Sequence, residues 1–260
     1  MDPAYFAEHA SKSEFLEEKT KNALGMMKEA GFEIAGLVEV VVDEQLPFMG
    51  YTTRKWKEHV IVVSGMAVDS GLVEGLLIHE MSHICRTEKN HPSHDYRLLN
   101  DFTRRLSSKY RFSAKYQVEI LQQIINHIQD LYADDIAFEV FRKNQAKPPF
   151  PLERMSDFFL SWIKTEPSRL RNKTKERWVN ASILLSNAFA ISNLERHHVE
   201  DVGDRMKTAN EMFLSKLDEP FREEFSYFRT LMTNLKEDAK EQEFKDELLA
   251  YVDHFLQLTS

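Results

Sequence analysis

The residues best suited to catalysis or metal binding are two histidines and a glutamate in the stretch GLLIHEMSHICR, residues 75–86. His79 and His83 are four residues apart. A helix turns about 100° per residue, so their side chains lie about 40° apart in projection and one turn apart along the axis. Both rings can therefore approach one metal ion from the same face, and Glu80 lies beside that face, where a carboxylate can accept a proton from an activated water. The pattern predicts one zinc ion and hydrolytic chemistry.

The surroundings of this motif are almost entirely apolar. Five large apolar residues flank it: Leu76, Leu77, Ile78, Met81 and Ile84. The helix that carries the motif is therefore expected to be buried, and buried imidazoles and carboxylates are costly unless they are hydrogen-bonded or bind a metal. This favours the zinc site over its alternative, a hydrogen-bonded structural pair of histidines. Cys85 is expected to be a small core residue.

A catalytic zinc site usually has three protein ligands, and the third must come from elsewhere in the chain. The extended metzincin signature is absent, because Arg86 and Lys89 stand where that signature has glycine and histidine. The strongest candidate is Asp130, in the stretch INHIQDLYADDIAF at 125–138. Its carboxylate can coordinate zinc from a second helix.

Other side chains compete for the same role. His127, Asp130 and Asp134 are spaced i, i+3 and i+7, so they share one helix face. Asp134 can orient a histidine ligand through its second ring nitrogen. His127 is an alternative metal ligand, as are His91 and His94, which otherwise form a surface turn. A solvated helix face is the alternative interpretation of the two acids.

Two capping patterns indicate where helices begin near the N-terminal side. Ser11 and Glu14 form a capping box, which predicts a helix that begins at Glu14 and stops at Gly31. Asp69 and Ser70 are expected to cap the helix that carries the motif.

Between these two helices the residue pattern becomes extended. Runs rich in Val and Ile predict one strand over 37–42 and another over 59–64, with an irregular strand within 47–58 between them. A small sheet is therefore expected on the N-terminal side of the motif.

After the motif, the chain is predicted to be helical. The pattern is helical over 96–142, and KPPFP at 147–151 is the candidate linker, because proline breaks helices. We predict a zincin-like metallopeptidase domain over 1–146 and a helical C-terminal region over 152–260. The predicted class is α+β and mostly helical, with a small N-terminal-side sheet and the HExxH helix.

Composition restricts the partners. The formal net charge is -8, which argues against nucleic acid or an anionic membrane as a partner. The most apolar stretch, 178–194, is interrupted by asparagines and shorter than the roughly 20 residues of a membrane span, so we expect a buried helix and no membrane span. A single cysteine and no signal-peptide pattern predict the cytoplasm. The sequence does not indicate the oligomeric state.

The order of segments around the motif is similar to that of a peptidase family. The segment PFMGYTTRKWKEHVIVVSGMAVDSGLVEGLLIHEMSHI contains a Phe-containing apolar segment with a glycine, a strand, a Gly–hydrophobic pair and the zinc helix. DLYAD at 130–134 is similar to a downstream Glu-x-x-Ala/Cys-Asp signature, with aspartate in place of the glutamate ligand. Residues 45–138 thus resemble the gluzincin metallopeptidases related to the CAAX prenyl proteases and heat-shock membrane endopeptidases, cousins of the β-lactam-sensing transducer peptidases.

The resemblance implies how a substrate would bind. The segment from Phe48 to Thr53, with Met49, Gly50 and Tyr51, would be the sheet edge that accepts an extended peptide. Glycine would allow close approach of the backbone. The alternative is a plain edge strand. The membrane spans usual in that family are missing from the expected elements, so membrane-protein substrates are not implied.

Peptide hydrolysis also needs a group that stabilises negative charge developing on the carbonyl. His197 and His198 are candidates, with an ordinary surface helix end as the alternative. The sequence thus predicts a zinc-dependent metallopeptidase that acts on peptides or unfolded proteins, with Glu80 as general base. The alternatives are a catalytically silent metal-binding scaffold or regulator, and an interaction module built on the C-terminal helices.

Overall fold

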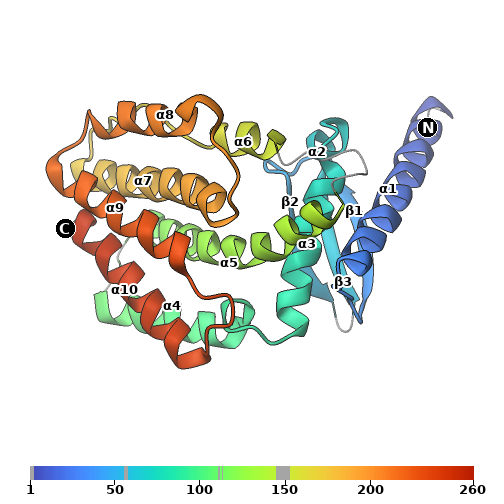
Figure 1. Cartoon of the computed structure of the whole chain (residues 1–260), viewed down its shortest axis with the longest axis horizontal. Helices are drawn as coiled ribbons and strands as arrows, with labels where there is room; N and C mark the ends of the chain where they lie inside the picture. The colour runs from blue at the N-terminus through green and yellow to red at the C-terminus, as the bar shows by residue number, and fades with distance from the viewer. Residues whose placement is uncertain (1–2, 56–57, 111, 113, 145–152) are drawn as a thin grey trace. The chain divides into compact units, whose positions relative to one another are not determined.

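The fold is α+β and mostly helical, with a three-stranded sheet toward the N-terminal side, which confirms the predicted class (Figure 1). It is known from a computed structural model, which describes residues 3–55, 58–110, 112, 114–144 and 153–260. Contacts between residues divide the chain into two compact units. The first comprises residues 1–91 and 133–150, and the second comprises residues 92–132 and 151–260.

The predicted domain boundary differs from the boundary between the two units that the contacts define. Residues 92–132 belong with the C-terminal helices by contacts, whereas the predicted first domain runs to residue 146. The predicted linker, 147–151, lies outside the described residues.

The sheet belongs to the first unit and has the strand order β1-β3-β2. Its strands are β1 (Leu37–Asp43), β2 (Gly50–Lys55) and β3 (Glu58–Ser64). The central strand β3 pairs parallel with β1 and antiparallel with β2, so β2 forms one edge. Ile61 and Val63 of β3 are fully buried, as expected for β-branched residues in a central strand. The strand β2 lies within its predicted stretch, and β1 and β3 each extend one residue beyond theirs, to Asp43 and from Glu58.

The first unit also contains three whole helices, α1 (Pro3–Glu29), α2 (Gly65–Asp69) and α3 (Val73–Glu88), and the end of a fourth, from Ala133 onward. Figure 1 shows α1 and α3 beside the sheet, and α1 packs on α3 while α3 packs on β2. The helix α3 carries the HExxH motif and has six nearly fully buried apolar residues: Val73, Leu77, Ile78, Met81, Ile84 and Cys85.

Both predicted N-caps are wrong, although the predicted stop is right. The helix α1 begins at Pro3, a residue preorganised for the first helical turn, so position 11 lies inside it. It ends before Gly31, whose φ of 91° is left-handed, and Phe32 N–H donates to Met27 C=O at 2.9 Å. The chain therefore enters the sheet where the sequence indicated.

The second wrong cap lies just before the motif. Ser64, at the end of β3, caps the short helix α2 by accepting from the Ala67 N–H at 3.1 Å. Ser70 ends α2 rather than beginning α3, and α3 begins after Leu72, which makes no side-chain cap hydrogen bond. The turn at Gly71, with φ 69°, separates the two helices.

The second unit is a set of helices. They are α4 (Tyr96–Tyr110), α5 (Lys115–Lys143, whose last turns belong to the first unit), α6 (Glu153–Leu160), α7 (Lys173–Arg196), α8 (Arg205–Leu214), α9 (Glu219–Asn234) and α10 (Glu241–Thr259), with short 3-10 turns η1 (Pro92–His94) and η2 (Val202–Asp204). The helix α7 packs against α6, α9 and α10 and contains the apolar stretch 178–194. Within the described ranges, no helix is long and apolar enough to cross a bilayer.

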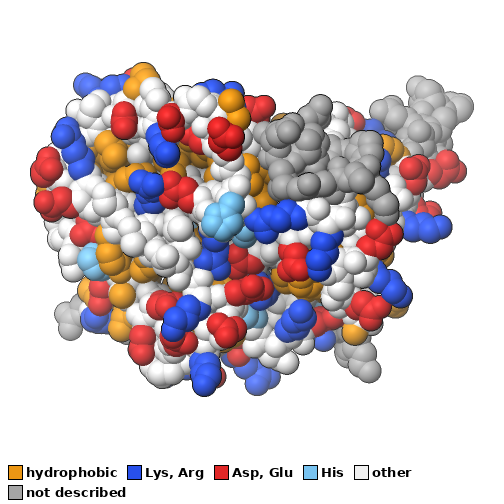
Figure 2. Space-filling model, viewed as in Figure 1, with side chains coloured by type: hydrophobic (Ala, Val, Ile, Leu, Met, Phe, Trp, Pro, Cys, Tyr) orange, Lys and Arg blue, Asp and Glu red, His pale blue; other side chains and the backbone are white. Residues whose placement is uncertain are grey.

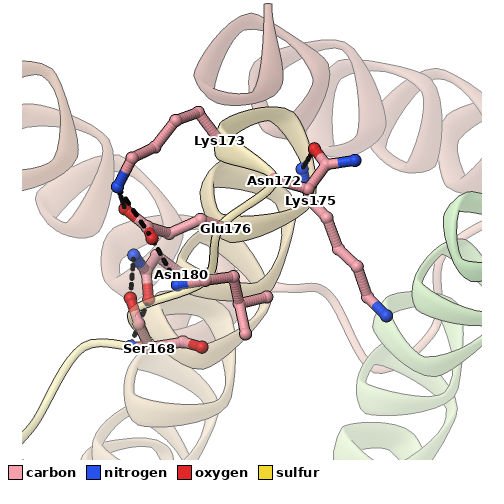
Figure 3. A network of polar contacts seen from close by, with 7 residues as sticks. Ser168, Asn172, Lys173, Lys175, Glu176 and Asn180 are labelled. Atoms are coloured by element: carbon pink, nitrogen blue, oxygen red, sulfur yellow. Dashed lines mark hydrogen bonds and ion pairs between the residues drawn. The ribbon is translucent and has the colours of Figure 1, made fainter.

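A polar network fixes the N-terminal end of α7 (Figure 3). The Asn172 side chain caps the helix by accepting from the Lys175 N–H at 2.9 Å. Asn180 accepts from the Ser168 N–H at 2.7 Å and donates to the Ser168 C=O at 3.2 Å. These bonds tie the incoming segment to the first turns of α7 and so set the start of this buried helix.

Candidate metal centre

The two motif histidines converge on one point beside α3. Their Nε2 atoms are 3.1 Å apart, and the rings meet nearly edge to face, with centroids 4.7 Å apart. His79 and His83 are both half-buried, because they lie at the boundary of the apolar face of α3. The 3.6-residue period of the helix places them there, one turn apart.

Asp134 contacts the opposite side of the His79 ring. Its Oδ1 lies 2.7 Å from His79 Nδ1, and its side chain is 8% exposed. A carboxylate at this nitrogen favours the tautomer with the proton on Nδ1, which leaves the Nε2 lone pair for a metal ion. The contact is the one expected of Asp134 from its spacing.

Asp130 completes a set of donor atoms. Among the described residues, His79, His83 and Asp130 form a group that could hold a metal ion, with one ligand atom from each within 4.8 Å of the others. Tetrahedral zinc, with bonds of about 2.0–2.2 Å, places its ligand atoms about 3.3–3.6 Å apart. The two imidazole nitrogens are near that spacing, and two imidazoles with one carboxylate are donors that suit zinc and other divalent ions.

Glu80 lies between the two motif histidines in sequence and is 5% exposed. Its carboxylate accepts a hydrogen bond from the Thr52 hydroxyl of β2, with 2.7 Å between Thr52 Oγ1 and Glu80 Oε2. The same oxygen of Thr52 lies 3.3 Å from the Glu80 C=O. Thr52 lies in the segment predicted to accept a peptide, but its contact with Glu80 could not be predicted, because it depends on the packing of β2 against α3.

His127, the alternative ligand, lies in a different environment. It is 5% exposed and stacks on Phe189 of α7, with ring centroids 5.1 Å apart and planes inclined by 17°. Its Nε2 is 3.5 Å from the Ser186 hydroxyl. Burial lowers the pKa of His127 to about 4, against the opposing attraction of Asp130. His127 is not part of the group that could hold a metal ion.

The remaining candidate histidines are also outside this group. His94 lies in η1 with its Nδ1 2.7 Å from the Ser93 hydroxyl, and His91 follows the end of α3. His197 is the C-cap residue of α7 and is buried, whereas His198 is exposed with a left-handed φ of 53°. The role of His197 and His198 in stabilising the transition state stays a prediction.

The segment expected to accept a peptide begins just before β2. Phe48 and Tyr51 are 51% and 42% exposed, with ring centroids 6.0 Å apart. A Cβ at Gly50 would lie 2.8 Å from the Val62 carbonyl oxygen and 3.2 Å from Leu76 of α3, so glycine permits the close approach there. Met49 C=O accepts from the Ser64 N–H at 2.9 Å, which extends the pairing of this edge.

Cys85 is buried in α3, as expected for a core residue. Burial raises the pKa of its thiol to about 11. Because metals bind the thiolate form, this side chain is unsuited to ligation.

The fold and these side chains define a mostly helical α+β protein with an HExxH helix and a His–His–Asp group that could hold a metal ion. The chain belongs to the family of unknown function DUF5781, whose model matches residues 19–257. The match includes both helices that carry the group. No curated protein matches the chain, and no solved structure matches it.

Proposed function

We propose that this protein is a zinc-dependent metallopeptidase that resembles the gluzincins. The observation that carries the proposal is the convergence of His79, His83 and Asp130 within 4.8 Å, next to the buried carboxylate of Glu80. Two imidazoles and one carboxylate are a typical ligand set of catalytic zinc, which keeps a fourth position open.

Each side chain has a role that its position supports. His79, His83 and Asp130 hold the ion, and Asp134 keeps His79 in the ligating tautomer. Zinc, when bound, supplies an activated water and polarises the substrate carbonyl. Glu80 accepts the proton of the attacking water and passes it to the leaving amine.

The substrate in this proposal is an extended peptide or an unfolded protein. An edge strand offers main-chain hydrogen bonds to an added strand, and β2 is such an edge with the exposed rings of Phe48 and Tyr51 beside it. Figure 2 shows basic and acidic side chains interspersed over the visible face, and the net charge is -8. Both observations support a function without a nucleic-acid partner. The single cysteine supports a reducing compartment such as the cytoplasm.

The test is cleavage of an unfolded protein such as casein by the full chain loaded with zinc. We expect chelator-sensitive cleavage that Glu80→Gln lowers by about 10²–10⁴-fold, as for loss of a general base. The matched control is Glu74→Gln, on the same helix and equally buried at 5% exposure, whose partner is Lys19 at 3.4 Å. This variant should keep the wild-type rate.

Zinc content separates the enzyme from a silent metal-binding protein. Glu80→Gln should keep its zinc, because Glu80 is not in the ligand group, whereas His83→Ala should lose it. A wild-type chain that binds zinc stoichiometrically but cleaves nothing would establish the scaffold or regulator instead.

A further inference from the structure

The carboxylate of the predicted general base is held by a side chain from the sheet. Glu80 is 5% exposed, and a carboxylate this buried needs hydrogen-bond donors. Thr52 has one hydroxyl proton and two nearby acceptors on Glu80, Oε2 at 2.7 Å and the main-chain oxygen at 3.3 Å. Since one proton makes one strong bond, the shorter distance assigns it to the carboxylate.

We propose that Thr52 is a positioning residue for Glu80. Its hydroxyl engages Oε2, which fixes the rotation of the carboxylate and presents Oε1 as the oxygen that accepts the proton. This inference rests on the proposed function and deepens it, because it assigns a second element, the edge strand β2, to the placement of the base.

The surroundings of Thr52 hold its hydroxyl in place. It is a β-branched residue, so χ1 is stiff, and its backbone pairs with the fully buried Ile61 of β3. Two residues earlier, Gly50 allows β2 to lie against Leu76 of α3. The hydroxyl therefore reaches Glu80 from a strand whose register and distance from α3 are both fixed.

A consequence follows for substrate binding. The strand that would pair with a peptide also carries the hydroxyl that orients the base. A peptide added to β2 would thus bind beside a carboxylate that is already oriented, and removal of the hydroxyl should affect the chemical step more than binding.

The experiment compares kcat and KM of the zinc-loaded full chain on an unfolded protein substrate. Thr52→Val removes the hydroxyl at nearly constant shape, and we expect kcat to fall about 10- to 100-fold with KM within about twofold, as for a lost hydrogen bond to a charged group. Thr52→Ser keeps the hydroxyl and should restore most of kcat.

The matched control is Thr20→Val in α1. Thr20 is also half-buried, and its hydroxyl donates a bond of the same 2.7 Å, but to the Leu16 C=O. It should keep the wild-type kcat. If Thr52→Val keeps the wild-type kcat, or if Thr52→Ser loses as much as Thr52→Val, the positioning role is overturned while the peptidase stands.

A second readout needs no activity. In metal-free protein, Thr52→Val should lower the urea midpoint in the wild-type background but much less in the Glu80→Ala background, because the partner is then absent. Additive shifts would overturn the inference whatever the activity. A coupled pair in a wild-type chain that cleaves nothing would overturn the proposed function and leave the hydrogen bond a purely structural one.

Discussion

At the scale of single residues, His127 is a buried imidazole that stays neutral. Its ring stacks on Phe189, and its Nδ1 has no hydrogen-bond partner in the part of the chain that the structure describes. Burial lowers the pKa of His127 to about 4 from an ordinary value of 6.5, although Asp130 opposes the shift. The side chain therefore behaves as a packed aromatic at neutral pH.

This environment predicts a specific pH dependence of stability. As the pH falls below 6.5, the unfolded chain protonates His127 while the folded chain does not, until the pH nears the folded pKa of about 4. The folded state should therefore lose about 3 kcal/mol between pH 6.5 and pH 4 from this group. His127→Phe should lack that component, so its urea-unfolding free energy should fall less steeply over this range.

Comparison with the wild type isolates the effect, since every other titrating group is shared. Parallel curves for the two proteins would contradict the prediction. Zinc affinity provides the second measurement: His127→Phe should bind zinc like the wild type, and a large loss of affinity would make His127 the third ligand in place of Asp130.

The choice of the third metal ligand shows which part of the site could be predicted from residue spacing alone. His79 and His83 belong to one helix, so their geometry is local and could be predicted from the sequence. His127 and Asp130 are three residues apart on the same face of α5, and spacing could not separate them. The difference between them comes from long-range packing, which stacks His127 on Phe189.

At the scale of elements, the C-terminal end of α3 is anchored to the sheet by Glu88. Its carboxylate accepts from the backbone N–H groups of Ala35 at 2.8 Å and Gly36 at 2.9 Å, and lies 3.0 Å from His59 Nε2. Burial alone would raise the pKa of Glu88, but these hydrogen bonds together hold the pKa below its ordinary value. The carboxylate thus links the end of the motif helix to the segment that enters β1.

We expect Glu88→Ala to lower the free energy of unfolding by about 1.5–3 kcal/mol, because it removes bonds to a charged group and leaves His59, which is 2% exposed, without this partner. Urea denaturation at neutral pH measures the loss. The lowered pKa sets its sign with pH: the contribution is present above the unfolded pKa of about 4.5 and is lost as the pH falls through the folded value.

The control for this element is Glu33→Ala, which removes a 71% exposed carboxylate 3.3 Å from Lys28 and should change stability by about 0–1 kcal/mol. Equal losses in the two variants would mean that Glu88 does not anchor α3.

The strands and one helix end could be predicted from the sequence better than the helix starts. The strands and the stop at Gly31 could be predicted, because β-branched runs and a left-handed glycine are local signals. The helix starts could not. Ser11 lies in a stretch that helix formation from Pro3 already includes, and the serine that caps the next helix is Ser64, which the pairing of β3 places at a helix start.

At the scale of the whole molecule, the order of elements could be predicted but their grouping could not. The grouping of residues 92–132 with the C-terminal helices depends on contacts far apart in sequence. One example is the buried Tyr251 hydroxyl of α10, which donates to the Ile124 C=O of α5 at 3.0 Å. No local sequence pattern predicts a hydrogen bond between residues on two helices this far apart in the chain.

The proposed metal ligands come from two separate helices, so metal binding should depend on the stability of the fold. The unfolded chain does not hold His79, His83 and Asp130 together, so an ion that binds the folded chain must raise its free energy of unfolding. At a free zinc concentration about 100 times the dissociation constant, the gain should be about 2.7 kcal/mol. A thermal unfolding series of the full chain at increasing zinc concentration measures it.

Two controls make this prediction specific. His83→Ala should lose the response to zinc, whereas His94→Ala, which removes a histidine outside the group, should keep it. Magnesium at the same concentration should have little effect, because it prefers oxygen ligands to imidazole. If zinc stabilises the wild type and His83→Ala equally, it binds elsewhere, and the convergence beside α3 has no role in metal binding.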